Sequence, residues 1–231
     1  MSTIAENIAG IRAQMAEAAK KAGRDPSEIL LCAATKMNDA ERVKEAVAAG
    51  VDCCGENRVQ EIQAKRPLGA YTGKPLHFIG HLQRNKVKQV VGHVALIQSV
   101  GSLELLDEIE KVAAARGLVQ DILLEVNIGR EAAKSGFAPE KVLPAAGAAL
   151  ERTHVRVRGL MTIPPADAQR DANFRYFQEV QALYVDMNQK LFHNELEYLS
   201  MGMSGDYEDA IRAGATMVRV GSAIFGARHY N

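Results

Sequence analysis

The sequence predicts an α/β fold: a single-domain (β/α)8 barrel of the TIM type with an extra N-terminal helix. Eight short apolar runs alternate with segments of helical pattern, as expected when helices join the strands of a parallel sheet. The chain has 231 residues, a length at which such barrels often form one domain. No linker, low-complexity tract or repeat divides it, so we expect one domain over residues 1–231. An open doubly wound sheet is the alternative, but the number of strands favours the barrel.

The predicted strands are the eight apolar runs, taken in chain order. They lie at residues 29–35, 51–55, 76–80, 94–100, 121–127, 155–163, 196–201 and 216–220. Helical segments are predicted between them at residues 39–49, 58–66, 83–91, 102–116, 139–152, 171–191 and 205–213. In the segment 102–116, Ser102 is placed to cap the helix and Gly117 follows it.

The extra helix opens the chain. Thr3 and Glu6 have the spacing of a capping box, and Gly23 marks the end of the pattern. The apolar face of this helix has the spacing of successive turns and consists of Ile4, Ile8, Ile11 and Met15.

Composition and charge exclude several classes of protein. Lys and Arg number 28, as do Asp and Glu, so the formal net charge is zero, and no basic surplus points to nucleic acid or an anionic membrane. We interpret the basic stretch 84–88 as a solvated helix face. No apolar run approaches the length of a membrane span, and the first residues do not resemble a signal peptide. We therefore expect a cytoplasmic protein.

The chain has three cysteines, Cys32, Cys53 and Cys54, all in apolar runs. An odd number with two adjacent members suits a reducing cytosol. We expect them to be buried as small apolar side chains, with no redox or metal role.

Polar residues gather where the predicted strands end, and in a barrel these ends form the functional mouth. The residues at these positions are Lys36, Glu56, Asn57, His81, Ser99, Asn127, Met161, Thr162, Ser200 to Ser204, and Arg219 to Ser222. One such residue would mean little, but eight sets that converge on one mouth indicate a site.

Two turns rich in glycine and serine follow the last two strands, at residues 200–211 and 219–228. Backbone N–H groups at a helix start bind phosphate well, glycine permits close approach, and serine adds a hydroxyl. Barrels frequently bind phosphate with these two loops. Each turn alone is equally explained by helix capping, whereas the two together favour a phosphate site.

Lys36 ends the stretch "LLCAATK" at 30–36. An amine in a barrel mouth opposite a phosphate site can form an imine with a carbonyl compound, and burial or a nearby cation lowers its pKa. Position alone favours a solvated lysine, because most lysines are exposed. Asn57 in "GENRVQE" (55–61) has two equal interpretations: a hydrogen-bonding group in the mouth, or a cap of the next helix.

His77 and His81 in "HFIGH" do not form a metal site. Along a strand they lie about 13 Å apart, too far to share one ion, and a helix is excluded by the short run and Gly80. We therefore predict no metal site, and His81 is a candidate to line the mouth.

The sequence resembles a known family, the pyridoxal phosphate (PLP) homeostasis proteins. These are small PLP-binding barrels related to the N-terminal domain of alanine racemase. The matching stretches run in order over nearly the whole chain, and the last is the longest and most specific. They are "AATK" (33–36), "GENRVQE" (55–61), "HFIGHLQRNK" (77–86), "EVNIGREAAKSG" (125–136), "RGLMTIPP" (158–165) and "LSMGMSGDYEDAIRAGATMVRVGSAIFGAR" (199–228).

The resemblance implies that PLP is held as a Schiff base on Lys36 and that Arg219 faces the pyridine nitrogen. It also implies that four residues surround the phosphate, namely Ser200, Ser204, Gly221 and Ser222. We also assign Asn57 to the cofactor site. Arg58 and the stretch "GREAA" (129–133) depart from the family pattern near the mouth, which bears on partner or ligand preference more than on PLP binding.

The resemblance also implies a function: the protein buffers or delivers PLP and is no enzyme. We assign no catalytic residue. Arginine at the ring nitrogen weakens the ring as an electron sink, we expect no second domain beyond Asn231, and no motif marks Tyr71, Tyr207 or Tyr230 as an acid or base. The expected partners are PLP and apo PLP-dependent enzymes, and we expect a monomer.

Three rivals remain at this stage: a racemase-like PLP enzyme, an imine-forming aldolase acting on a phosphosugar, and an interaction module whose PLP is structural. Turnover of an amino acid would indicate the first, and absence of PLP from the purified protein the second. Unchanged partner binding without PLP would indicate the third.

Overall fold

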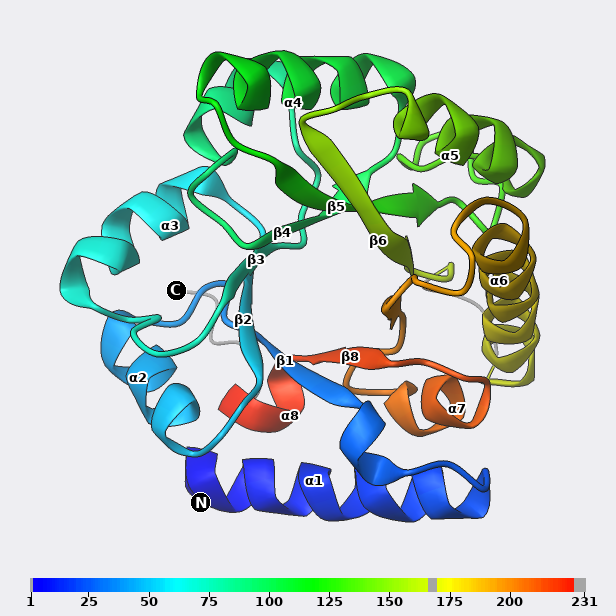
Figure 1. Cartoon of the computed structure of the whole chain (residues 1–231). Helices are drawn as coiled ribbons and strands as arrows, with labels where there is room; N and C mark the ends of the chain where they lie inside the picture. The colour runs from blue at the N-terminus through cyan, green and yellow to red at the C-terminus, as the bar shows by residue number, and fades with distance from the viewer. Residues whose placement is uncertain (1, 166–169, 227–231) are drawn as a thin grey trace.

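In the computed structural model, which describes residues 2–165 and 170–226, eight parallel strands close into a barrel (Figure 1). Their order around the barrel follows the sequence, and β1 closes the ring by pairing with β8. The strands are β1 Leu30–Ala34, β2 Cys53–Glu56, β3 Leu76–Phe78, β4 Leu96–Val100, β5 Gln120–Val126, β6 Val155–Thr162, β7 Tyr198–Ser200 and β8 Met217–Val220. The predicted fold class is confirmed, although most strands are shorter than their apolar runs.

Helices surround the sheet on its outer face (Figure 1). They are α1 Ile4–Lys21, α2 Ala40–Ala48, α3 Val59–Lys65, α4 Leu103–Ala115, α5 Val142–Leu150, α6 Arg170–Leu191, α7 Tyr207–Arg212 and α8 Ser222–Phe225. Between β3 and β4, the segment predicted as a helix at 83–91 forms a 3-10 helix, Arg84–Gln89. No side chain caps its start, and its backbone closes the tighter bonds from Lys86 N to Gln83 O and from Val90 N to Val87 O.

α1 is the extra helix, and it begins at the predicted capping box. Thr3 accepts from the Glu6 backbone, and the Glu6 side chain accepts from the Thr3 backbone. Its predicted apolar face is buried against α7 and α8, beside which it runs in Figure 1. Asn7 Nδ2 also donates to Ile224 O at 2.9 Å, which fixes α8 to the start of the chain.

The apolar residues form two layers because side chains of a strand alternate between its two faces. The outer layer lies between sheet and helices. The inner layer fills the barrel and contains Cys32, Cys53, Leu96, Leu123, Met161 and Met217. Burial of such surface contributes about 25 cal/mol per Å², so both layers stabilise the closed ring.

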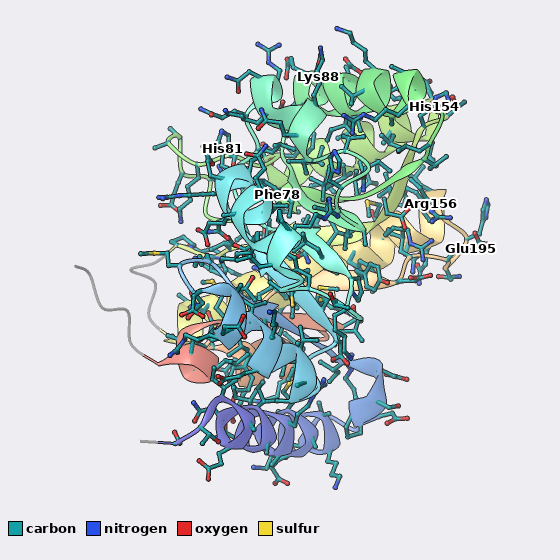
Figure 2. All side chains as sticks on the ribbon, turned by 90° about the vertical axis from the view of Figure 1, so that its left-hand side faces the viewer. Phe78, His81, Lys88, His154, Arg156 and Glu195 are labelled. Carbon is teal, nitrogen blue, oxygen red and sulfur yellow. The ribbon has the colours of Figure 1, made fainter. Side chains whose placement is uncertain are left out.

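The two ends of the barrel are distinct in Figure 2, where His81, after β3, lies at the opposite end from Arg156 and Glu195. Because all strands are parallel, the residues that follow them meet at the end marked by His81. Among the described residues, no helix has the length and apolar character needed to cross a membrane.

Candidate functional site

Lys36 lines a cavity of about 780 Å³ beyond the end of β1. Gly221 and Ser222, at the start of α8, line the same cavity. They meet Lys36 because β1 pairs with β8, with Ala33 opposite Val220. The structure therefore brings three of the sequence-predicted site residues together.

Ser204 joins this group through the backbone of α8. Its Oγ accepts from Gly221 N at 3.2 Å and from Ala223 N at 3.3 Å, so two N–H groups point at one oxygen. An added Cβ at Gly221 would lie only 3.4 Å from the carbonyl oxygen and from the Cβ of Ala34. The turn is thus closely packed against the β1 end and offers the donors that an anionic oxygen requires.

Arg219 lies inside the barrel and is 3% exposed. Its Nη1 donates to Ser200 Oγ at 2.6 Å and its Nη2 to Thr162 O at 2.9 Å. Burial lowers the pKa of the guanidinium, while surrounding acidic groups, including Glu125, raise it. Ser200 and Arg219, predicted separately, are therefore direct partners.

A chain of polar side chains continues from Ser200 across the barrel. Ser200 Oγ donates to Gln98 Oε1 at 2.7 Å, and Gln98 Nε2 lies 3.0 Å from His77 Nδ1. Both Gln98 and His77 are buried, so these bonds satisfy groups that water does not reach. Nothing in the sequence marked Gln98, because it stands inside an apolar strand.

Asn57 is half-buried at the end of β2 and is not part of the cavity wall beside Lys36. Its Oδ1 is buried without a hydrogen-bond partner, and its backbone lies against Gly80, where an added Cβ would meet Asn57 O at 2.3 Å. The interpretation of Asn57 as a helix cap is wrong, because the N-cap of α3 is Arg58. An unpaired buried oxygen suits a ligand-binding group.

A buried charge cluster that the sequence did not reveal holds the backbone on both sides of Lys36. Lys65 Nζ lies 2.9 Å from Thr35 O, 2.8 Å from Glu56 Oε1 and 2.7 Å from Glu61 Oε2. On the other side, Met37 N donates to Glu61 Oε2 at 2.7 Å. The spacing of Glu61 and Lys65 by four residues was the available signal.

Glu56 is the centre of this cluster and is fully buried. Burial raises the pKa of Glu56, and the Lys65 and Thr35 side chains oppose that shift. Tyr71 OH donates to Glu56 Oε1 at 3.0 Å, and burial raises the pKa of this tyrosine. Tyr71 is therefore engaged in the cluster as a donor.

The remaining strand-end residues divide into three groups. His81 and Ser99 line a second cavity of about 360 Å³. Asn127 organises the loop after β5, because its Nδ2 donates to Glu131 O at 2.9 Å. Met161 belongs to the inner layer and Thr162 is buried, so these two support the mouth and do not line either cavity.

All three cysteines are buried and free, as predicted. Cys54 packs in the outer layer, and burial raises its pKa to about 12. His77 and His81 lie in different surroundings, the barrel interior and the second cavity. The sequence did not anticipate that Cys32, Cys53 and His77 would meet, because they come from three strands.

Comparison with known proteins identifies relatives of this chain among PLP-related proteins. The family model described as "Alanine racemase, N-terminal domain" matches residues 4–229. A pyridoxal phosphate homeostasis protein of Pseudomonas aeruginosa is 42% identical over 230 residues, covering 100% of this chain and 98% of the relative. One from Aquifex aeolicus is 40% identical over 225 residues, covering 97% and 98%.

Among solved structures, PipY of Synechococcus elongatus PCC7942 with PLP bound superposes with a TM-score of 0.84. It is 31% identical and covers 97% of this chain and 100% of PipY. These relatives thus match the chain over nearly its whole length, both in sequence and in the barrel. The chain belongs to the pyridoxal phosphate homeostasis protein family, whose barrel is that of the N-terminal domain of alanine racemase.

Proposed function

We propose that this protein binds PLP covalently through Lys36 and buffers or delivers it in the cytoplasm, without turning over a substrate. The observation that carries the proposal is the shared cavity, which both Lys36 and the Gly221–Ser222 turn line. An amine and a phosphate site in one cavity are the two features that recognise an aldehyde bearing a phosphate.

The residues present fit PLP. Ser204, Gly221 and Ser222 would hold the phosphate, since the N–H groups of Gly221 and Ala223 already converge on one oxygen. Ser200, whose hydroxyl binds Arg219 and Gln98 inside the barrel, would act in the site through Arg219. Asn57 does not line this cavity, and its unpaired Oδ1 at the end of β2 is the feature on which we propose it as a cofactor-site residue. When bound, PLP supplies an aldehyde for the lysine amine and an electron-withdrawing ring.

Arg219 supports binding over turnover. By the family resemblance it would face the ring nitrogen, and a guanidinium is permanently charged, so it disfavours a proton there. Its bonds to Ser200 Oγ and Thr162 O fix it in place before any ligand arrives. The ring is then a weak electron sink, which suits a protein that stores the cofactor.

Two tyrosines that could serve a racemase-like enzyme are engaged elsewhere. Tyr71 OH donates to Glu56 and Tyr207 OH to Gln14, and burial raises both tyrosine pKa values. Neither residue belongs to the described wall of the Lys36 cavity. Tyr230 lies outside the described residues. This arrangement favours the homeostasis role over the racemase alternative.

Borohydride trapping tests the attachment. Purified protein loaded with PLP is reduced, digested and mapped by mass spectrometry, and we expect the pyridoxyl group on Lys36. Lys36→Ala should lose it, with Lys134 as the substitute site, whereas Lys44→Ala, an exposed lysine paired with Glu41, should label like the wild type. Pyridoxyl on another lysine of the wild type would overturn the assignment.

A transfer assay tests the role. We propose that the protein acts as a monomer and passes PLP to apo PLP-dependent enzymes. Loaded protein is mixed with an apo-enzyme in the presence of a trap for free PLP. Reactivation faster than free PLP allows supports delivery, and reactivation at the rate of PLP release reduces the role to buffering. Turnover of an amino acid near about 10 s⁻¹ would make the protein an enzyme.

A further inference from the structure

Two thiols and an imidazole meet inside the barrel, outside the Lys36 cavity. Among the described residues, Cys32 Sγ, Cys53 Sγ and a ring nitrogen of His77 all lie within 4.8 Å of one another. Their exposed fractions are 0%, 2% and 6%. They therefore form a compact donor set that bulk water does not solvate.

The strand register creates this meeting. Cys32 on β1 pairs with Cys53 on β2, and Gly55, two residues further along β2, pairs with His77 on β3. The two cysteines belong to the inner layer with Met217. Three adjacent strands thus each contribute one ligand-type side chain to the same level of the barrel interior.

The spacing of the donors suits one ion. Metal–sulfur bonds of about 2.3 Å and metal–nitrogen bonds of about 2.0–2.1 Å place ligand atoms roughly 3.5–4.5 Å apart around a shared centre. The observed limit of 4.8 Å brings the three atoms into this range with small side-chain adjustments.

The donors are soft. Thiolate and thioether sulfur select Cu(I) and zinc over magnesium or calcium, and the set holds no carboxylate. Three donors complete a trigonal Cu(I) site, whereas structural zinc almost always takes four. Two thiolates and Cu(I) leave one negative charge, and the buried, positively charged Arg219 stands opposite Cys32 in the β1–β8 register. The monovalent ion therefore balances the charge of this interior.

Gln98 contacts the ring of His77 and the sulfur of Met217 beside the donor set. Gln98 Nε2 lies 3.0 Å from His77 Nδ1 and 3.2 Å from Met217 Sδ. Ligating histidines are usually oriented by such a neighbour. This contact and the bond that Gln98 Oε1 accepts from Ser200 Oγ hold the His77 ring in one orientation.

We propose that Cys32, Cys53 and His77 form an interior site for a thiophilic d¹⁰ cation, Cu(I) in particular. On binding, the two thiol protons leave to solvent, two Cu–S bonds and one Cu–N bond form, and the copper stays Cu(I). None of the three residues lines the Lys36 cavity, and the tests below use protein without PLP, so either proposal can fail without the other.

The chain provides a matched control in Cys54. It is adjacent to Cys53 and equally buried, but it packs in the outer layer between the sheet and the helices. Cys54→Ala therefore removes a buried thiol without touching the interior set. Cys32→Ala and Cys53→Ala each remove a proposed ligand.

The experiment uses the full chain without PLP. It is incubated anaerobically with Cu(I) in competition with bicinchoninate, and is also produced in copper-supplemented medium so that it folds with the ion present. We expect one Cu(I) per chain. Loss of a residue that only orients a metal ligand costs about 10–100-fold in affinity. Loss of Cys32 or Cys53 should therefore cost more than about 100-fold, while Cys54→Ala should bind like the wild type.

X-ray absorption of loaded wild-type protein gives a second measurement that does not depend on variant folding. We expect two sulfur ligands and one nitrogen ligand. An absence of binding, binding unchanged in Cys32→Ala and Cys53→Ala, an equal loss in Cys54→Ala, or a spectrum without sulfur ligands would each overturn the site. Stoichiometric Zn(II) binding with no Cu(I) binding would overturn the assignment of the ion.

Discussion

Lys65 Nζ lies 2.8 Å from Glu56 Oε1 in a pair whose side chains are 9% and 0% exposed. The same ammonium binds the carbonyl oxygen of Thr35 at 2.9 Å, so this ion pair joins the ends of β1 and β2 directly before Lys36. Ion pairs on the surface contribute little to stability. Removal of one member of a buried pair is strongly destabilising, because it leaves the other charge buried without a partner.

Lys65→Met should therefore destabilise the protein by about 3–5 kcal/mol, because Glu56 is left as an uncompensated buried charge. The double variant Glu56→Gln/Lys65→Met should lose less than the single variant. The control Lys44→Met, at an exposed pair, should change stability by less than about 1 kcal/mol. Urea unfolding measures all three, and a loss below about 1 kcal/mol in Lys65→Met would contradict the role of the pair.

Glu125→Gln should change how stability depends on pH. Burial raises the pKa of Glu125, and the Ser135 hydroxyl that donates to it at 3.0 Å only partly opposes the shift. At pH values above this raised pKa, the folded state must hold a disfavoured carboxylate that the unfolded chain ionises freely. Ionised Glu125 therefore lowers the free energy of unfolding of the wild type. This loss of stability disappears as the pH falls toward the pKa that Glu125 has in the unfolded chain.

We therefore expect Glu125→Gln to be more stable than the wild type at pH 7–8 and the difference to shrink toward pH 4.5. Denaturant unfolding at several pH values measures this difference directly, and acid effects common to both proteins cancel. A difference that grows on acidification would show that the sign is wrong.

Ser222→Asp should nearly abolish PLP retention, because it adds a negative charge where we place the phosphate. A single charge-assisted bond contributes roughly 1.5–3 kcal/mol, so pyridoxal without phosphate should bind at least about tenfold more weakly. Ser102→Asp is the matched control, since Ser102 also stands at a helix start, the N-cap of α4. Spectroscopic titration compares the proteins and ligands, and equal affinity for PLP and pyridoxal would refute the phosphate site.

Gly159→Ala should separate β6 from β7. Gly159 has φ +150°, and an added Cβ would lie 1.7 Å from Tyr198 O, so we expect a loss of about 3 kcal/mol or more. Gly10, exposed within α1, has nothing within 4 Å of such a Cβ, so Gly10→Ala should gain about 0.5–1 kcal/mol. Thermal and urea unfolding measure the stability of both variants. An unchanged stability of Gly159→Ala would contradict the expected clash with Tyr198.

The fold was predictable because each strand of this barrel reads as a short apolar run, and the capping box of Thr3 and Glu6 marked the first helix. The site was predictable only in part. Lys36 and Ser222 follow neighbouring strands, so barrel closure alone brings them together. The bond between Arg219 and Ser200 depends on how far each side chain reaches into the interior, which a sequence pattern does not encode.

The interior cluster of Cys32, Cys53 and His77 was missed for a related reason. The short distance between these residues depends on the register of three strands, and sequence spacing compares residues only along the chain. Lys65 was missed because a lysine on a helix is ordinarily exposed. Its burial became evident only when Glu56, Thr35 and Glu61 were placed around it.

The bond from Asn7 to Ile224 O joins residues 217 positions apart, and β1 closes the barrel only by pairing with β8. Contacts of such long range form slowly, because the entropy of closing the intervening chain must be lost before they stabilise anything. During synthesis the N-terminal helix and β1 must wait for α8 and β8 until almost the whole chain has left the ribosome. Lys36 and the Gly221–Ser222 turn therefore come together in one late step of folding, and a nascent chain cannot hold a ligand between them.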